Sequence, residues 1–440
     1  MNIGIIGGGI AGLTAAYKLS EKGHKVTLFE KEAYLGGQVA TFEVEGERLE
    51  RFYHHIFTSD IDIIQLVDEL GLSEKLLWLD SKVGFFHGER IYDFVTPMDL
   101  LRFSPVGLTD RVRMGIISLY LRRHKNWHSF EKTTAREWLI RYGGRRNYDV
   151  VWGPLLRGKF GTSSDEVGMV WFWGKIHLRF ASRSKGMGQE RLGYLKGSFG
   201  HLIDVIAQRI LAAGGTIHRN SPVSRIVMEQ GKAAGMEVSQ DGSAGFHPFE
   251  AIIATVPSLI FLDLVPQLAG DYAAKLKKTR YQAAVCLVII LKKSLSHIYW
   301  MNISDSSAPF LAAIEHTNLI DSSIYGGKHI LYLSNYLSKD SSLYRASADE
   351  LLAVYLPHLK RINPEFDPNW IDSYHRFSDD AGQPIVTTNY SQQIPEHRTP
   401  IAGLYLANTT QIYPEDRGLN YSIRLGMNIS KTVSKKSSSN

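Results

Sequence analysis

The sequence contains a single cysteine in 440 residues, Cys286, within the apolar run of residues 283–291. One thiol cannot form an intramolecular disulfide, a redox dithiol or a cysteine-based metal cluster, so dithiol oxidoreductases are excluded. Such sparse cysteine usage fits a reducing compartment, and we expect a cytoplasmic protein.

Long hydrophobic runs are also missing, because no stretch approaches the roughly 18 apolar residues of a membrane span. The apolar start, residues 1–19, lacks a basic leader and a small-residue cleavage site, so we interpret it as mature protein. The net charge of +6 is spread along the chain without a basic, aromatic-interleaved face. We therefore expect no nucleic-acid partner.

A metal site is not expected either. His54 and His55 are neighbours rather than ligands spaced along one helical face, and the sequence has no HExxH motif. What the chain does have is the composition of a folded protein, with 44% hydrophobic and 21% charged residues. At roughly 100 to 200 residues per domain, its length indicates two or three domains.

A glycine-rich motif follows the first predicted strand, residues 2–6, and opens a predicted helix over residues 10–22. Its G-x-G-x-x-G spacing is typical of a dinucleotide loop, in which the glycines allow a tight turn, close approach of a pyrophosphate and close packing of the helix. The helix N-terminus can then bind phosphate through its amides. We assign to this loop Gly7, Gly9, Ile10, Ala11 and Gly12.

The second predicted strand, residues 25–30, ends in an acid eighteen residues after Gly12. The Glu30 carboxylate is expected to accept hydrogen bonds from ribose hydroxyls, which favours an unphosphorylated ribose. The following segment resembles the acid-x5-Gly-Gly pattern of flavoproteins with two dinucleotide-binding domains, which implies FAD. Its candidate cofactor residues are Glu30, Lys31, Gly36, Gly37, Gln38 and Val39.

Segments 193–199, 221–223, 254–257, 403–408 and 416–421 extend this resemblance to the amine oxidase, protoporphyrinogen oxidase and phytoene desaturase superfamily, with some likeness to UDP-galactopyranose mutase. The resemblance implies that the Val223 backbone meets the adenine and that a helix N-terminus faces the flavin. Asn408, Asn420 and Tyr421 replace the family's smaller residues. The cofactor residues implied here are Val223, Asn408, Gly418, Leu419, Asn420 and Tyr421.

These patterns predict an α/β fold with a discontinuous Rossmann-like FAD-binding domain formed by residues 1–60, 194–260 and 395–433. Residues 61–193 and 261–394 would form an α+β substrate-binding region. The polar stretch 434–440 is expected to be a disordered tail.

The candidate catalytic residues are His54, His55, Arg157 and Lys159. The histidines could orient a substrate or move protons near neutral pH. Arg157 and Lys159 could bind an anion. The alternatives are packed or exposed histidines and an aromatic cluster with surface cations.

Residues 96–121 interleave apolar side chains with arginines. Packing inside the substrate region is the simpler account, and peripheral contact with a membrane is an alternative that we do not favour.

The leading hypothesis is an FAD-dependent oxidoreductase in which hydride moves from a small-molecule substrate to flavin N5, as a desaturation or an amine or alcohol oxidation. One alternative is a non-redox flavoenzyme that acts on a nucleotide sugar. Another is an FAD-binding, non-catalytic partner protein. The sequence leaves open whether the substrate is anionic.

Overall fold

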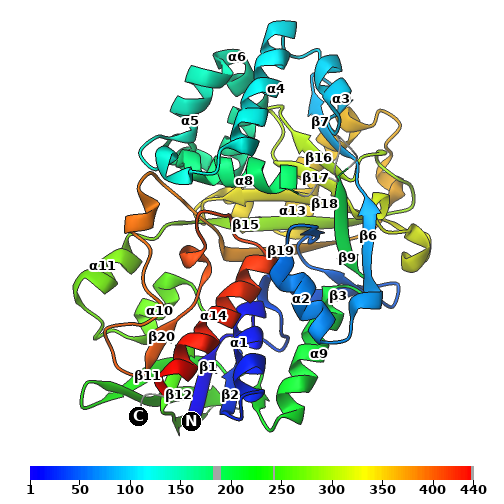
Figure 1. The fold of residues 1–440 in the computed structure, drawn as a ribbon. Helices are drawn as coiled ribbons and strands as arrows, with labels where there is room; N and C mark the ends of the chain where they lie inside the picture. Colours follow the sequence, from blue (N-terminus) through cyan, green and yellow to red (C-terminus); the bar gives the residue numbers. More distant parts are fainter. Residues whose placement is uncertain (182–189, 241–242, 438–440) are drawn as a thin grey trace.

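The computed structural model describes residues 1–181, 190–240 and 243–437 (Figure 1). A parallel five-stranded sheet forms its nucleotide-binding half, and its first three elements are the βαβ unit that the sequence predicts. The strand order is β10 (Thr216–His218), β2 (Lys25–Phe29), β1 (Asn2–Ile6), β14 (Ala251–Ala254) and β20 (Leu404–Leu406). This arrangement agrees with the predicted α/β Rossmann-like fold.

The two faces of this sheet are covered by different layers, because successive strand side chains point in opposite directions. Ile3 and Ile5 pack in the core shared with three helices, α1 (Ile10–Ser20), α9 (Phe199–Ala212) and α14 (Leu419–Ser437). Ile252 and Leu404 pack on the other face, in the core shared with a three-stranded antiparallel sheet. Its strands are β11 (Val223–Glu229), β12 (Lys232–Gln240) and β13 (Ser243–Pro248).

A seven-stranded sheet forms the centre of the second half (Figure 1). Its order is β19 (Ile371–Pro384), β15 (Tyr281–Leu291), β18 (His329–Leu337), β17 (Ala312–Glu315), β16 (Trp300–Ile303), β7 (Val83–His87) and β8 (Arg90–Asp93). Leu287 and Ile289 pack on α13 (Ala348–Ile362), whereas Cys286 and Val288 face the core of the nucleotide-binding half. The buried strand β15 therefore joins the two halves.

The remaining helices and strands are shorter or lie at the edges. A helical region between β8 and β9 (Arg191–Leu195) lies at the end of the molecule opposite the two termini (Figure 1). It contains α3 (Pro97–Arg102), α4 (Leu108–Arg123), α5 (Ala135–Trp138), α6 (Arg145–Asn147), α7 (Gly153–Phe160) and α8 (Met169–Ala181). The other elements are β3 (Thr41–Val44), β4 (Glu47–Glu50), β5 (Ile56–Phe57), α2 (Ile61–Glu69), β6 (Leu76–Asp80), α10 (Ser258–Leu264), α11 (Gly270–Lys277) and α12 (Ser342–Arg345).

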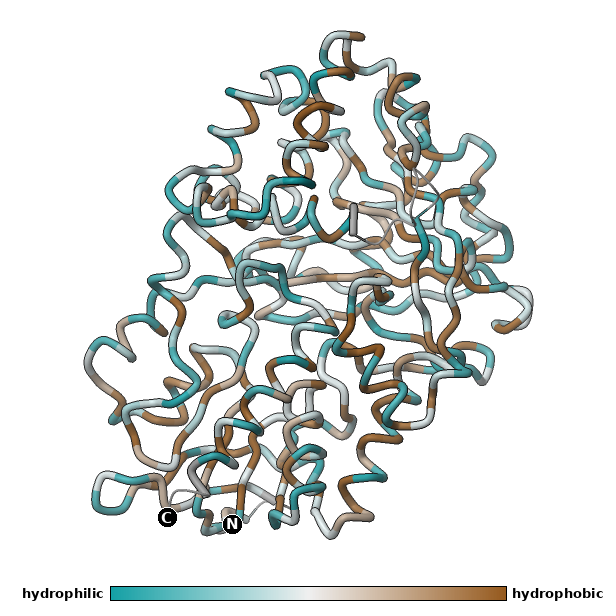
Figure 2. Tube along the Cα trace, viewed as in Figure 1, coloured by the Kyte–Doolittle hydropathy of each residue, from teal (hydrophilic) through white to brown (hydrophobic). Residues whose placement is uncertain are grey.

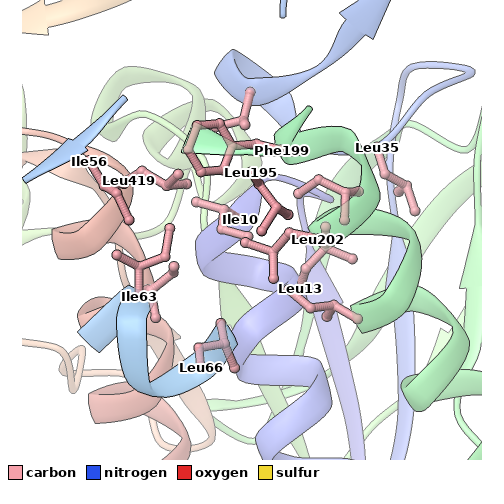
Figure 3. Close-up of a cluster of buried hydrophobic side chains, with 14 of the residues drawn as sticks. Ile10, Leu13, Leu35, Ile56, Ile63, Leu66, Leu195, Phe199, Leu202 and Leu419 are labelled. Atoms are coloured by element: carbon pink, nitrogen blue, oxygen red, sulfur yellow. The ribbon is translucent and has the colours of Figure 1, made fainter. Parts of the chain in front are cut away.

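Two details differ from the domain limits drawn from the sequence. Helix α2, assigned to the substrate region, packs its Ile63 and Leu66 beside Ile10 and Leu13 of α1 in the core of the nucleotide-binding half (Figure 3). Helix α14 continues to Ser437, so residues 434–437 are helical rather than part of a disordered tail, and residues 438–440 lie outside the described residues. Buried Val433, near the end of α14, explains why the helix extends this far.

Candidate functional site

A cavity of about 760 Å³ runs past the glycine loop toward the second half of the molecule. It is lined by residues from all three segments of the predicted FAD-binding domain. The predicted cofactor residues that line it are Gly7, Gly9, Ile10, Ala11, Glu30, Lys31, Gly36, Gly37, Gln38, Val39, Val223, Asn408, Gly418 and Leu419. The fold thus brings together residues that lie up to about four hundred positions apart in the sequence.

The glycines of the first loop have separate steric roles. Gly7 has a φ of +103°, which L side chains rarely adopt. A Cβ on Gly12 would lie 2.0 Å from the Gly7 carbonyl oxygen, so this glycine allows α1 to pack on β1 and does not line the cavity. A Cβ on Gly9 would meet no atom within 4 Å, and no side chain caps α1 there. Open space and uncapped amides at one helix N-terminus fit a pyrophosphate.

Glu30 is buried at the end of β2 and faces the loop. Its carboxylate accepts the Gly8 amide at 2.6 Å and the Glu32 amide at 2.9 Å. A carboxylate has about four lone-pair sites, so acceptor capacity is left for ribose hydroxyls. These two hydrogen bonds therefore hold the Glu30 side chain in place without blocking the predicted hydrogen bonds from ribose hydroxyls.

The side chains of three predicted cofactor residues mainly contact other parts of the protein. Asn408 lines the cavity, but its amide group donates to the Val256 carbonyl at 3.0 Å. Asn420 does not line it, because its side-chain oxygen accepts the Ile63 amide at 3.0 Å and ties α14 to α2. Tyr421 is buried in a small apolar cluster beside the cavity residue Leu425 and also lies outside the lining.

The two adjacent histidines have different surroundings. His54 lines the cavity and directs Nδ1 at the Phe52 carbonyl, 2.7 Å away, so a neutral ring carries its proton there and presents Nε2 as an acceptor. His55 is outside the lining and places Nδ1 2.9 Å from the Tyr299 hydroxyl. Burial lowers the pKa of His54 to about 4 and that of His55 to about 3. Both rings are therefore neutral near pH 7.

The two predicted anion binders of α7, Arg157 and Lys159, also have different surroundings. Arg157 is exposed, and its guanidinium lies against Gly153 one turn earlier in the helix. Lys159 is largely buried, with its Nζ 2.9 Å from Asp416 Oδ2. Lys175 of α8 approaches the same oxygen at 2.6 Å.

Arg417 is the main cavity residue that the sequence did not identify as a site residue. Its guanidinium donates to Gln383 Oε1 at 3.1 Å, to Gln38 Oε1 at 3.0 Å and to the Tyr336 hydroxyl at 2.7 Å. It precedes α14, whose first residues line the same end of the cavity. Its place in the segment 416–421 was a signal in the sequence, but two of its partners lie on the distant strands β18 and β19 and the third, Gln38, lies in the loop after Gly36.

The open glycine loop, the fixed Glu30 carboxylate and the helix N-termini fit a dinucleotide. Residues 10–414 match the family of flavin-containing amine oxidoreductases. The chain belongs to this family. It is a flavin-dependent oxidoreductase that binds FAD, which confirms the predicted cofactor and enzyme class.

Individual relatives are distant. A 15-cis-phytoene desaturase of Oncidium hybrid cultivar is 22% identical over 433 residues, covering 92% of this chain and 73% of that protein. A mitochondrial protoporphyrinogen oxidase of Nicotiana tabacum is 26% identical over 171 residues, or 38% of this chain and 34% of that protein. The structure of a reduced UDP-galactopyranose mutase shares the fold at a TM-score of 0.75 and 16% identity, covering 98% of this chain and 95% of that one. The predicted superfamily resemblance is confirmed.

None of the described helices is both long and apolar enough to cross a bilayer. Within residues 1–181, 190–240 and 243–437, no group of three or more His, Cys, Asp or Glu side chains could hold a metal ion.

Proposed function

We propose that this chain oxidises a small organic substrate by hydride loss to bound FAD, as a desaturation or as the oxidation of an alcohol or amine. The supporting observation is the continuous cavity that joins Glu30 and the glycine loop to His54, Arg417 and the start of α14. Bound FAD supplies the two-electron acceptor. Relatives named phytoene desaturase and protoporphyrinogen oxidase support a dehydrogenation of this kind.

The protein's own groups orient the reactants in this proposal. The α14 amides at Gly418 and Leu419 offer positive dipole ends, which favour negative charge at that end of the cavity. Neutral His54 accepts a hydrogen bond through Nε2 and does not act as a charged acid. An aromatic group beside it, in which Tyr53 meets Trp300 edge-on at 4.9 Å, gives the apolar surroundings that exclude water.

The charge beside the cavity favours a neutral or anionic substrate over a protonated amine. Lys159, Lys175 and Arg417 are close together near the α14 end. A substrate ammonium about 4 Å from one such cation would be repelled by roughly 4 kcal/mol at an effective dielectric constant near 20. We therefore place alcohols and C–H substrates ahead of charged amines.

The test is anaerobic reduction of the FAD-loaded protein by panels of alcohols, polyenes, amines and nucleotide sugars. We expect one class to bleach the flavin bands with stoichiometric formation of an oxidised product. Rearrangement of a nucleotide sugar without net oxidation would instead establish the mutase-like alternative. FAD that no substrate reduces would favour a non-catalytic binding protein.

A membrane surface is the partner that we propose for α4. Leu108, Val112, Ile116 and Leu119 form an exposed stripe, with Ile116 61% exposed, while Met114, Ile117 and Leu121 form the buried face. The helix thus packs inside the substrate region on one face, as the simpler expectation has it, and leaves apolar side chains exposed on the other. Figure 2 shows hydrophobic residues along the helices at this end of the molecule.

The charge of the same region supports this partner. Residues 97–146 contain eleven Lys and Arg but four Asp and Glu, an excess of seven cations, whereas the whole chain has an excess of six. Apolar side chains flanked by arginines suit the interface of an anionic bilayer. The proposal is a cytoplasmic protein with peripheral membrane contact.

A further inference from the structure

A cluster of cations shares one buried carboxylate beside the cavity. Lys159 and Lys175 both contact Asp416 Oδ2, at 2.9 and 2.6 Å, and the Asp416 side chain is 2% exposed. Gln383 donates to its other oxygen at 2.9 Å. The adjacent Arg417 adds a third cation that bonds to uncharged oxygens. Both oxygens of the carboxylate are thus already engaged.

The cluster retains positive charge even when a second nearby carboxylate, that of Asp379, is counted. Asp379 interacts electrostatically with Arg417 and accepts a hydrogen bond from Gln38 at 3.0 Å. Three cations and two carboxylates leave an excess of one positive charge. Buried charge is costly unless it is opposed by charge and hydrogen bonds, so this excess favours a monoanion.

Trp171 supplies a second, independent observation. Its ring centroid lies 5.2 Å from Lys159 Nζ and 5.8 Å from Lys175 Nζ. Its indole Nε1 is buried without a hydrogen-bond partner among the described residues. A buried donor left unpaired costs about 1–3 kcal/mol. The ring beside the two ammonium groups therefore carries a donor that has no acceptor among the described residues.

We propose that Lys159 and Lys175, over the Trp171 ring, bind a carboxylate group of the substrate. This inference rests on the proposed oxidation and names the class of molecule that undergoes it: an organic acid with one carboxylate near this cluster. Lys175 keeps 38% of its side chain exposed, so the subsite is accessible from outside. Its single excess charge suits a carboxylate better than the diphosphate of a nucleotide sugar.

The experiment measures calorimetric binding of benzoate and of benzamide to the full-length, FAD-loaded protein. The two probes share size and ring, and differ in charge. We expect benzoate to bind at least tenfold more tightly than benzamide. Lys175→Met should abolish this preference, and Lys175→Arg should restore most of it. Lys328→Met is the matched control, because Lys328 pairs with Asp372 at a separate position.

Asp416→Asn separates a ligand subsite from a purely structural cluster. Removing the internal carboxylate releases both ammonium groups, so benzoate should bind more tightly to this variant. Equal affinity for the two probes, or an Asp416→Asn variant that loses benzoate as Lys175→Met does, would overturn the proposal. Failure of the proposed oxidation is distinguishable, since it would leave benzoate binding intact while no substrate bleaches the flavin.

Discussion

Arg417 donates a hydrogen bond to Gln38 at 3.0 Å, although the two residues are 379 positions apart. Gln38 follows the Gly36-Gly37 pair of the cofactor loop, and Arg417 lies two residues before the start of α14. Both side chains line the cavity. The contact therefore joins the two chain segments that bound the end of the FAD site nearest the substrate region.

Replacing Arg417 by Met should weaken FAD binding without unfolding the protein. The change leaves oxygens of Gln38, Gln383 and Tyr336 without their donor, and a hydrogen bond to a charged group contributes about 1.5–3 kcal/mol. We expect the Kd for FAD, measured by quenching of flavin fluorescence, to rise at least about tenfold. Arg225→Met, which removes an exposed pair with Glu237, should leave it unchanged. An unaltered Kd in the Arg417 variant would contradict the role given to this contact.

Gly12→Ala should be far more damaging than the same change in another helix. Its Cβ would lie 2.0 Å from the Gly7 carbonyl oxygen, which is backbone and cannot move aside. We expect a loss of at least about 1–3 kcal/mol in the free energy of unfolding, together with loss of bound flavin. At Gly115 in α4 the nearest atom to a new Cβ is 3.6 Å away, so Gly115→Ala should be neutral or stabilising. Thermal unfolding and flavin content measure both effects.

Most of the correct predictions from the sequence came from local motifs. β1 spans Asn2–Ile6 as expected, because its alternating apolar residues and the glycine spacing are properties of neighbouring residues. Among the fourteen predicted cofactor residues that line the cavity, this local pattern supplied Gly7, Gly9, Ile10, Ala11 and Glu30, and the resemblance to flavoproteins supplied the others. Asn420 was placed by family resemblance, and nothing in its neighbours indicates that it caps α2 through Ile63.

The cluster of Lys159, Lys175 and Asp416 could not be predicted from the sequence, because only the tertiary packing brings these residues together. Lys159, Lys175 and Asp416 come from separate elements, and 241 positions separate Lys175 from Asp416. A local signal did exist: Trp171 and Lys175 have the i, i+4 spacing that places them on one helix face. That spacing indicates a shared face, but it does not reveal which carboxylate lies opposite.

The acid stability of the protein should depend on His55. Burial lowers the pKa of His55 to about 3, whereas an unfolded histidine titrates near 6.5. Between these values the unfolded state binds a proton that the folded state does not, so this group makes stability rise with pH. From pH 7 down to pH 5 it should remove about 2 kcal/mol of the unfolding free energy.

The His55→Phe variant isolates that contribution from the other titrating groups. It also removes the bond to the Tyr299 hydroxyl, a loss that lowers stability at both pH values alike. Urea unfolding at pH 7 and pH 5 should show a smaller difference for the variant than for the parent. Equal differences would mean that His55 titrates normally in the folded protein.

The exposed stripe of α4 predicts binding to anionic vesicles. We expect the FAD-loaded protein to sediment with vesicles of mixed phosphatidylglycerol and phosphatidylcholine, and less with phosphatidylcholine alone, since arginines flank the stripe. Leu108→Ser combined with Ile116→Ser should release it, because these side chains are 62% and 61% exposed and support no core. Leu211→Ser, at a 54% exposed position on α9, is the matched control. Retained sedimentation of the α4 variant, with its flavin content unchanged, would assign membrane contact to another surface.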